Sequence, residues 1–547
     1  MTDGADPRPP VPRVLFALVA PFRAFLRLEA ASGILLFFAS AASMALANSV
    51  WAGAWASILH APLGIRVGHR DLYWPLHHLV NDGLMTLFFF VVGMEIKREL
   101  VRGELRTFSR AILPAVAAVG GMVVPALLHH AIAAGTPAQR GWGIPMATDI
   151  AFALGCMTLV KSRVPTSLFV FLTALAIFDD LGAIIVIAAF YGGAIHWGFL
   201  ALAAGLGLLG FGLNRARVSS VWPYALVGAG LWFAMLRSGV HATLAGVVLG
   251  LMIPSAPPRD PRGVLDDLDE ALDALRRATR AKAEPPSGVI AAIERHLESV
   301  QSPLDRTVHG LQGLVAFGVV PLFALANAGV SLGASRVSVT SPAALGPFVG
   351  LLVGKPLGVV LTTLAVVRLR VAEPLKNATT LQLVATGTLA GVGFTMSLFV
   401  DGLAYGARAD LADAAKLGVL LASSLAALVG LALFRLGGKV EHDEESEGVS
   451  VVVDLPRFGQ GWRVEPWPVS GPLVGKTLGE AGVRERHGVT VLGVWKGMDA
   501  VEGRRALEPA GPDYRFAEGD TALLVAQDEQ LAAFRALNGE GTSGEGV

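Results

Sequence analysis

Residues 176–183 read Ala-Ile-Phe-Asp-Asp-Leu-Gly-Ala, and this stretch decides the fold because two carboxylates stand inside a long apolar run. The two acids are Asp179 and Asp180. A charged side chain at the centre of a bilayer costs about 2.5–3.5 kcal/mol on insertion scales. An apolar run that keeps such a pair therefore predicts a membrane-spanning helix whose acids have a function.

Two further charges lie in apolar surroundings of the same kind. Asp149 lies within Ala-Thr-Asp-Ile-Ala-Phe-Ala (147–153), and Lys355 lies within Val-Gly-Lys-Pro-Leu (353–357). Ionisable residues inside membrane-spanning segments mark ion and proton pathways and commonly pair with one another. Three acids and one base in this pattern predict an ion path, and the alternative is a buried ion-pair network with a structural role.

The composition indicates a membrane protein. Hydrophobic residues make up 53% of the 547 residues, charged residues only 16%, and the mean hydropathy is +0.57. These values exclude a disordered chain and predict an all-α polytopic membrane protein in contact with lipid, with no nucleic-acid partner. The sole cysteine, Cys156, excludes an intrachain disulfide framework. Residues 1–27 lack a short apolar region followed by a cleavage site, so we expect a cytoplasmic segment rather than a signal peptide.

Apolar stretches of spanning length, about 17–25 residues each, recur about 12 times within residues 28–437. The loops that would share a side with the N-terminus carry most of the arginine and lysine residues. Positive charge concentrates on the cytoplasmic side of a membrane, so we expect both termini in the cytoplasm.

Two of these spans carry helix breakers. The fourth contains Gly143 and Pro145, and the eleventh contains Gly387, Gly391 and Gly393. Proline removes a backbone donor, and irregular backbone at membrane depth is tolerated only where protein or a watery cavity surrounds it. Corresponding interrupted helices in the two halves of a chain point to a transport site. The sequence therefore predicts inverted repeats with two broken helices that cross, in spans 4 and 11.

Polar segments interrupt and follow the membrane domain. Residues 255–302 form a cytoplasmic insertion that contains an amphipathic pattern at 265–272, for which a solvated linker is the alternative. Residues 438–460 are expected to form an acidic linker and an entry strand at 449–453. Beyond them, residues 461–540 show β-branched runs at 489–494 and 522–525, expected as strands, and a helical tail at 528–537, which predict a small soluble α+β domain.

Six segments together resemble the NhaA-type sodium/proton antiporters. They are residues 147–155, 179–184, 239–246, 321–330, 354–358 and 391–397. The resemblance runs in order from about Leu26 to Arg435. It implies a secondary antiporter of the bacterial cytoplasmic (inner) membrane that exchanges Na+ and Li+ for protons, is electrogenic and pH-regulated, and is not an enzyme. It implies no cofactor, because these ions are transported.

The resemblance also implies roles for the charged residues. Asp180 is then the principal cation ligand, and Asp179 is a second ligand that is salt-bridged to Lys355. Asp149 would help the site and offset the helix N-termini that converge there, and Thr148 would add a hydroxyl oxygen. Sodium is a hard cation and prefers oxygen ligands. Protons and Na+ would compete for the same carboxylates, so that each displaces the other.

Five residues are candidates for the pH response. The i, i+3, i+4 spacing of Glu95, Arg98 and Glu99 puts them on one helix face, in a region that the resemblance links to pH control. An interfacial charge cluster that fixes topology is the alternative. His241 lies in an apolar span, where a packing role is the alternative to a sensor. His309 follows Val308 where the family usually has a Glu-His cluster, so this chain departs from the family there.

Two features concern contacts between helices and between chains. Asn327 would either line the ion path or bond across helices, since its small neighbours permit close packing. Residues 64–70 resemble the family's β-hairpin that pairs across a dimer, so a homodimer is expected, and a monomer with an ordinary loop is the alternative.

The C-terminal domain resembles the TrkA C-terminal (RCK-C) type over about residues 463–537. The segments that carry the resemblance are 470–478, 488–494 and 516–520. Such domains usually dimerise and sense small ligands, which implies a regulatory domain with a possible small-molecule ligand. An inert assembly or stability domain is the alternative.

Two other classes fit the sequence less well. An intramembrane aspartyl protease would need an Asp after Gly-x-Gly in its second catalytic helix, but Phe394 follows Gly393. A potassium channel would need a Thr-Val-Gly-Tyr-Gly-like filter, which this sequence does not contain.

Overall fold

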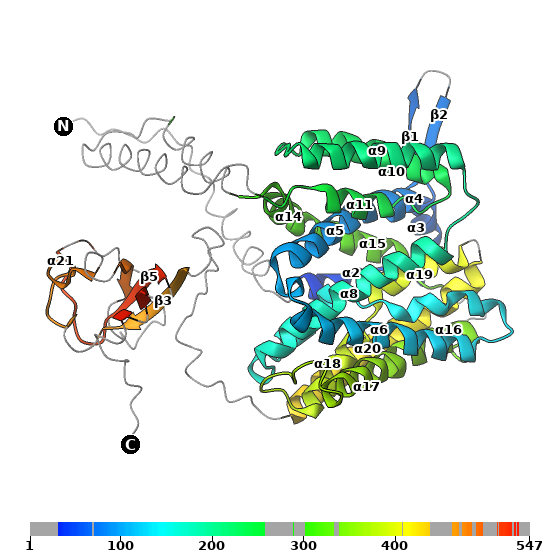
Figure 1. Cartoon of the computed structure of the whole chain (residues 1–547). Coiled ribbons are helices and arrows are strands. Elements are labelled where there is room, and N and C mark those ends of the chain that lie inside the picture. Colours follow the sequence, from blue (N-terminus) through cyan, green and yellow to red (C-terminus); the bar gives the residue numbers. More distant parts are fainter. Residues whose placement is uncertain are drawn as a thin grey trace, which may run out of the picture. The chain divides into compact units, whose positions relative to one another are not determined.

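The computed structural model describes residues 31–67, 70–256, 288, 301–332, 338–406, 408–437, 462–469, 473–483, 488–495, 511, 513–527, 530–531 and 533–534. They form two compact units, a larger helical one with the described residues to 256 and from 301 to 437, and a smaller one with residue 288 and those from 462 onwards (Figure 1). The expected N-terminal segment (1–27), most of the insertion 255–302 and the linker 438–460 lie outside the described residues.

The larger unit is built from helices. They are α2 (Ala31–Ala47), α3 (Ala52–Leu59), α4 (Leu76–His78), α5 (Met85–Arg102), α6 (Phe108–Ile132), α7 (Ile150–Thr158), α8 (Thr166–Phe190), α9 (Trp197–Arg215), α10 (Trp222–Ser238), α11 (Leu244–Met252), α14 (Pro303–Leu314), α15 (Val320–Asn327), α16 (Pro342–Val349), α17 (Lys355–Arg368), α18 (Thr380–Ala390), α19 (Phe394–Tyr405) and α20 (Ala409–Leu436).

Several of these helices continue into turns of a different pitch. The π-helical turns are η1 (Leu79–Leu84), η5 (Val315–Val319) and η6 (Gly350–Gly354), and the 3-10 segments are η2 (Glu104–Arg106), η3 (Pro137–Met146) and η4 (Lys161–Arg163). Turns of π-helix inside α-helices are frequent at functional sites. One of them, η6, leads directly into Lys355.

Large apolar side chains cover the outside of the helical unit. Phe108, Trp222 and Leu226 are 78%, 79% and 75% exposed. A soluble monomer rarely exposes so much apolar surface, whereas a lipid-facing surface requires it. The larger unit is therefore a multi-pass membrane domain.

The described helices account for most of the predicted spans. Seven of them are long and apolar enough to cross a membrane, or nine if each of two bent pairs counts as one span. The bent pairs are α2 with α3, at 115°, and α18 with α19, at 43°. The prediction of about 12 spans includes three further pieces that are short or interrupted: η3 with α7, the 17-residue α10 and the 9-residue α11.

Glycines bring two pairs of helices into backbone contact. A Cβ atom at Gly120 of α6 would lie 2.6 Å from the carbonyl oxygen of Gly358 in α17. A Cβ atom at Gly246 of α11 would lie 2.9 Å from the backbone nitrogen of Phe90 in α5. Small residues permit this close approach in membrane proteins, where van der Waals packing holds helices together.

Aromatic side chains fill another contact in the same unit. Phe399 of α19 lies 5.3 Å from Phe89 of α5 and 6.2 Å from Phe323 of α15, measured between ring centroids. All three rings are buried in one apolar cluster. This contact therefore joins the second half of a broken span to two other helices through side chains rather than backbone.

Two small β-sheets complete the description. Strands β1 (Pro62–Val67) and β2 (Arg70–Pro75) form an antiparallel hairpin that projects from one end of the helical unit (Figure 1). In the smaller unit, β3 (Trp462–Pro468), β5 (Thr521–Gln527) and β4 (Thr490–Trp495) form an antiparallel sheet in that order. The short helix α21 (Leu478–Ala481) begins with a capping box between Thr477 and Glu480.

Candidate functional site

Two interrupted helices meet at their breaks. The backbone leaves the helix between η3 and α7, at residues 147–149, and between α18 and α19, at residues 391–393. The N–H of Asp149 donates a hydrogen bond of 2.7 Å to the carbonyl oxygen of Val392. A backbone donor left free at one break is therefore paired with a backbone acceptor at the other. The breakers at Gly143, Pro145, Gly391 and Gly393 explain why helix stops here.

Asp149 joins the first turns of two helices. It is the N-cap of α7, and its Oδ1 accepts a bond of 3.1 Å from the backbone N–H of Phe152. Its Oδ2 accepts bonds from the N–H and the hydroxyl of Thr395, at 3.2 and 2.5 Å, at the start of α19. Helix N-termini carry partial positive charge, so this buried carboxylate is stabilised from two directions.

Asp179 and Lys355 form an ion pair inside the protein. Lys355 Nζ lies 2.6 Å from Asp179 Oδ2, and both side chains are 0% exposed. The hydroxyl of Thr148 also donates to Asp179 Oδ2, at 2.7 Å, and Lys355 donates a second bond to the carbonyl oxygen of Met146. This pair therefore links the intact helix α8 to α17 and to the break that precedes α7.

Asp180 has oxygen atoms that no neighbour uses. It is 4% exposed, and within the described chain neither its Oδ1 nor the Oδ1 of Asp179 has a hydrogen-bond partner. A buried carboxylate oxygen without a partner is costly unless a proton or a cation occupies it. Two adjacent acids with free oxygens thus offer ligands of the kind that Na+ prefers.

The described side chains do not form a site for a resident metal ion. No group of three or more His, Cys, Asp or Glu residues in this part of the chain is arranged to hold one. Asp149 is engaged by Thr395, and Asp179 is engaged through one oxygen by Lys355. A cation at Asp180 would therefore complete its shell with backbone, hydroxyl or water oxygens.

The structure separates the five pH-response candidates. Glu95, Arg98 and Glu99 lie on α5, and Glu95 is close enough to Asp180 for their charges to interact. His309 is on α14, where its Nδ1 lies 2.7 Å from the Asp305 carbonyl oxygen of the same helix.

His241 lies in a turn, and the expectation that it lies inside a span is wrong. Gly239 ends α10 with a φ of 85°, and α11 begins only at Leu244. One ring nitrogen of His241 lies 2.7 Å from the carbonyl oxygen of Tyr191, so the side chain ties this turn to the end of α8.

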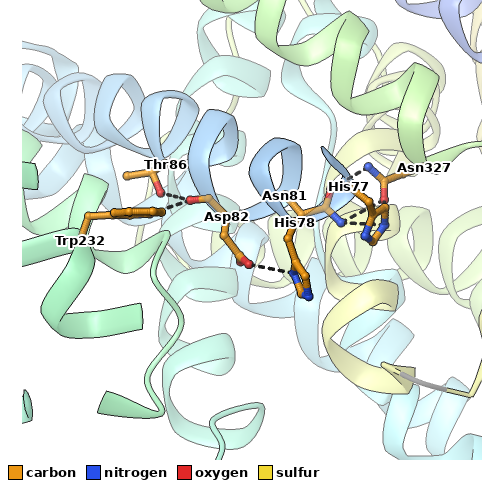
Figure 2. A network of polar contacts seen from close by, with 7 residues as sticks. All are labelled: His77, His78, Asn81, Asp82, Thr86, Trp232 and Asn327. Atoms are coloured by element: carbon orange, nitrogen blue, oxygen red, sulfur yellow. Dashed lines mark hydrogen bonds and ion pairs between the residues drawn. The ribbon is translucent and has the colours of Figure 1, made fainter. Parts of the chain in front are cut away.

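A polar network joins the start of the second span to α15 (Figure 2). The amide of Asn81 donates to Asn327 Oδ1 at 3.2 Å, and the amide of Asn327 donates back to Asn81 Oδ1 at 2.8 Å. The Nε2 of His77 lies within 3.2 Å of both side chains. Asn327 therefore bonds across helices, which is one of the two roles that the sequence left open.

Three polar residues of α19 were not predicted. Thr395 binds Asp149, Ser397 donates a bond of 2.8 Å to the carbonyl oxygen of Ile144, and Asp401 is 0% exposed. The signal for Asp401 was present, because this acid stands in the apolar run 398–404 just as Asp149 stands in its own.

Comparison with known proteins gives two family matches. The profile of Na+/H+ antiporter 1 matches residues 23–434, and the profile of the TrkA-C domain matches residues 467–539.

Relatives match nearly their whole length. The chain is 50% identical over 444 residues to Na(+)/H(+) antiporter NhaA 1 of Myxococcus xanthus (strain DK1622), which covers 80% of this chain and 98% of that protein. It is 46% identical over 451 residues to Na(+)/H(+) antiporter NhaA of Anaeromyxobacter sp. (strain Fw109-5), with 82% and 98% covered. For Na(+)/H(+) antiporter NhaA of Helicobacter pylori (strain HPAG1) the identity is 41% over 431 residues, with 77% and 96% covered.

Proposed function

The chain belongs to the Na+/H+ antiporter 1 family, and from this premise we propose that it exports Na+, and also Li+, in electrogenic exchange for protons. The observation that carries the proposal is the Asp179–Asp180 pair, buried beside the crossing of two broken helices with carboxylate oxygens that no described residue engages. Relatives at this level of identity carry the names of antiporters and not of enzymes.

In this proposal exchange follows from competition at one site. Asp180 binds the cation, and the free oxygen of Asp179 is the second ligand. Protons occupy the same oxygens when the cation leaves, so the two are bound in turn and carried in opposite directions. Lys355 keeps one oxygen of Asp179 neutralised, and Asp149 holds α7 and α19 in register around the site.

The proposal includes the arrangement in the membrane. About 12 spans in inverted repeats place both termini in the cytoplasm of a bacterial inner membrane, because arginine and lysine concentrate in the loops of that side. The hairpin β1–β2 would pair with that of a second chain to form a homodimer.

The direct test measures exchange in proteoliposomes loaded with buffer at defined pH. We expect added Na+ or Li+ to drive proton movement in the opposite direction. If two protons are released for each cation bound, one from Asp180 and one from Asp179 or from Lys355 when its bridge breaks, net charge moves, and a membrane potential contributes about 2.3 kcal/mol per charge per 100 mV. A valinomycin-clamped potassium gradient should therefore change the exchange rate and end point. Rates that ignore the imposed potential would indicate electroneutral exchange.

We further propose that the TrkA-C domain regulates exchange and helps to form the dimer, with a small-molecule ligand as its effector. Its described residues have an apolar core of their own, which includes Trp467, Val494, Phe516 and Leu524. A ligand bound there can affect transport only by favouring one conformation of the exchanger over another.

Truncation after about Lys439 tests this assignment. Because the charged residues of the site all lie before that point, we expect the truncated chain to insert, fold and exchange with a similar maximal rate. Its pH or ligand dependence should differ from that of the full chain. A truncated protein that inserts correctly and exchanges ions at no pH would make the domain part of the transport machinery.

A further inference from the structure

A fourth acid, Asp401, lies deep in the membrane domain. It is on α19, six residues beyond Thr395, and its side chain is 0% exposed. Within the described chain neither of its carboxylate oxygens has a hydrogen-bond partner. An ionised carboxylate in such a place is unstable, so the group is expected to be neutral unless a positive charge reaches it.

The face of α19 that carries Asp401 also carries two hydroxyl side chains that bond to backbone carbonyl oxygens of η3. Ser397 and Tyr405 lie four residues before and after Asp401, and therefore on the same helix face. Both hydroxyls donate bonds of 2.8 Å to carbonyl oxygens of η3, those of Ile144 and Ala138. Because these two hydroxyls already donate to carbonyl oxygens, neither of them donates to Asp401, so this face accommodates a protonated acid far better than an ionised one.

One positive charge is within reach on the neighbouring helix. The elements packed most closely against α19 are η3, α20 and α15. On α20, Lys416 and Asp413 act electrostatically on Asp401, and they form an ion pair of 3.8 Å with each other. Both side chains are about one-fifth exposed, so they reach solvent, whereas Asp401 does not.

The other charged groups on these elements lie further out. Asp410 and Arg435 of α20 and Arg140 of η3 are exposed, and Arg140 lines a surface pocket beside Trp142. Residues 320–327 of α15 contain no charged or titratable side chain. Tyr405 is the remaining titratable group near Asp401, and its hydroxyl is engaged by Ala138. Lys416 is therefore the counter-charge that a modest movement of α19 against α20 would bring to Asp401.

We propose that Asp401 is a second proton-binding site of the exchanger, which holds its proton in the conformation described here and releases it when Lys416 becomes its partner. This rests on the proposed antiport function and adds a group that titrates apart from the Asp179–Asp180 pair. Loss of the proton favours the alternative conformation, so Asp401 makes exchange faster at alkaline pH.

Asparagine at position 401 imitates the protonated acid at every pH. We expect Asp401→Asn to fold as the wild type does, because the carboxylate has no described partner to lose. At acidic pH it should exchange at the wild-type rate, and at alkaline pH about tenfold more slowly, the change expected if one pH unit of activation is lost. Asp401→Glu should retain the alkaline activation. The matched control is Asp410→Asn, which removes an exposed acid near the start of α20. It should exchange at the wild-type rate at both acidic and alkaline pH.

Two further measurements keep the proposal falsifiable if the asparagine variant folds poorly. Lys416→Gln removes the proposed counter-charge and should slow exchange at alkaline pH only. Infrared difference spectra of the wild type between neutral and alkaline pH should lose the carbonyl band of one protonated carboxylic acid, and this loss should be missing in Asp401→Asn. The proposal is overturned if the exchange rate of Asp401→Asn relative to the wild type is the same at every pH. It is also overturned if the wild type and Asp401→Asn lose the same infrared bands. If the wild type exchanges no ions, the antiport function is refuted. The infrared difference alone then decides whether Asp401 releases a proton.

Discussion

Replacing Asp180 with asparagine is expected to abolish Na+-driven proton release while the protein still inserts and folds. The carboxylate is almost fully buried, and its Oδ1 makes no hydrogen bond to a described residue, so its loss removes a ligand without breaking a contact. A neutral amide neither binds Na+ as an anion nor exchanges a proton, so the two ions lose the principal ligand for which they compete. Asp179→Asn should have nearly the same effect on exchange.

The measurement is ion-driven fluorescence quenching in vesicles, combined with a melting curve of the purified protein. A matched control is Asp305→Asn, which removes a partly exposed acid paired with Arg102 at 2.9 Å. Exposed pairs contribute about 0–1 kcal/mol, so this control should exchange normally. If both the Asp179 and the Asp180 variants exchange Na+ for protons at wild-type rates, the cation path lies elsewhere in the molecule.

Replacing Lys355 with alanine is expected to cost about 3–5 kcal/mol of stability, the usual effect of removing one partner of a buried ion pair. The lysine is 0% exposed and supplies the bonds to Asp179 and to the carbonyl oxygen of Met146. Without it, Asp179 keeps a buried charge whose remaining described donor is Thr148. Lys355→Arg should be milder because the positive charge is kept.

Denaturant unfolding in detergent micelles measures this effect. The double variant Asp179→Asn with Lys355→Met removes both charges and should recover much of the lost stability, since no unpaired charge stays buried. It should still fail to exchange ions. A Lys355→Ala protein with wild-type melting and wild-type transport would show that the ion pair supports neither property.

The charged residues and the helix breaks could be read from the sequence because the bilayer leaves few alternatives. A charge in an apolar run is rare enough to single out Asp149, Asp180 and Lys355, and breakers such as Pro145 show where helix cannot continue. The partner of Asp149 could not be read in this way. Thr395 lies 246 residues further along the chain, and the two residues meet only when both breaks are in place.

The smaller unit shows a different limit. The runs at 489–494 and 522–525 were predicted as strands and correspond to β4 and β5. The strand β3 was not predicted, and it contains Pro466 and Pro468, which argue against a central strand. The sheet order places β3 next to β5 only, so it is an edge strand among the described residues, where proline is tolerated. The predicted entry strand at 449–453 lies outside the described residues.

The glycine crossings determine which helices can move against one another. At Gly120 with Gly358, and at Gly246 with Phe90, backbone rests on backbone, and the nearest side chain at Gly120 is the short one of Thr362. Such a contact has a single close-packed arrangement, so α6 with α17 and α5 with α11 each behave as one rigid body. The rings of Phe399, Phe89 and Phe323 can repack. Any change in the side of the membrane from which Asp180 is accessible is therefore accommodated at this aromatic contact. Lys355, at the start of α17, moves together with α6.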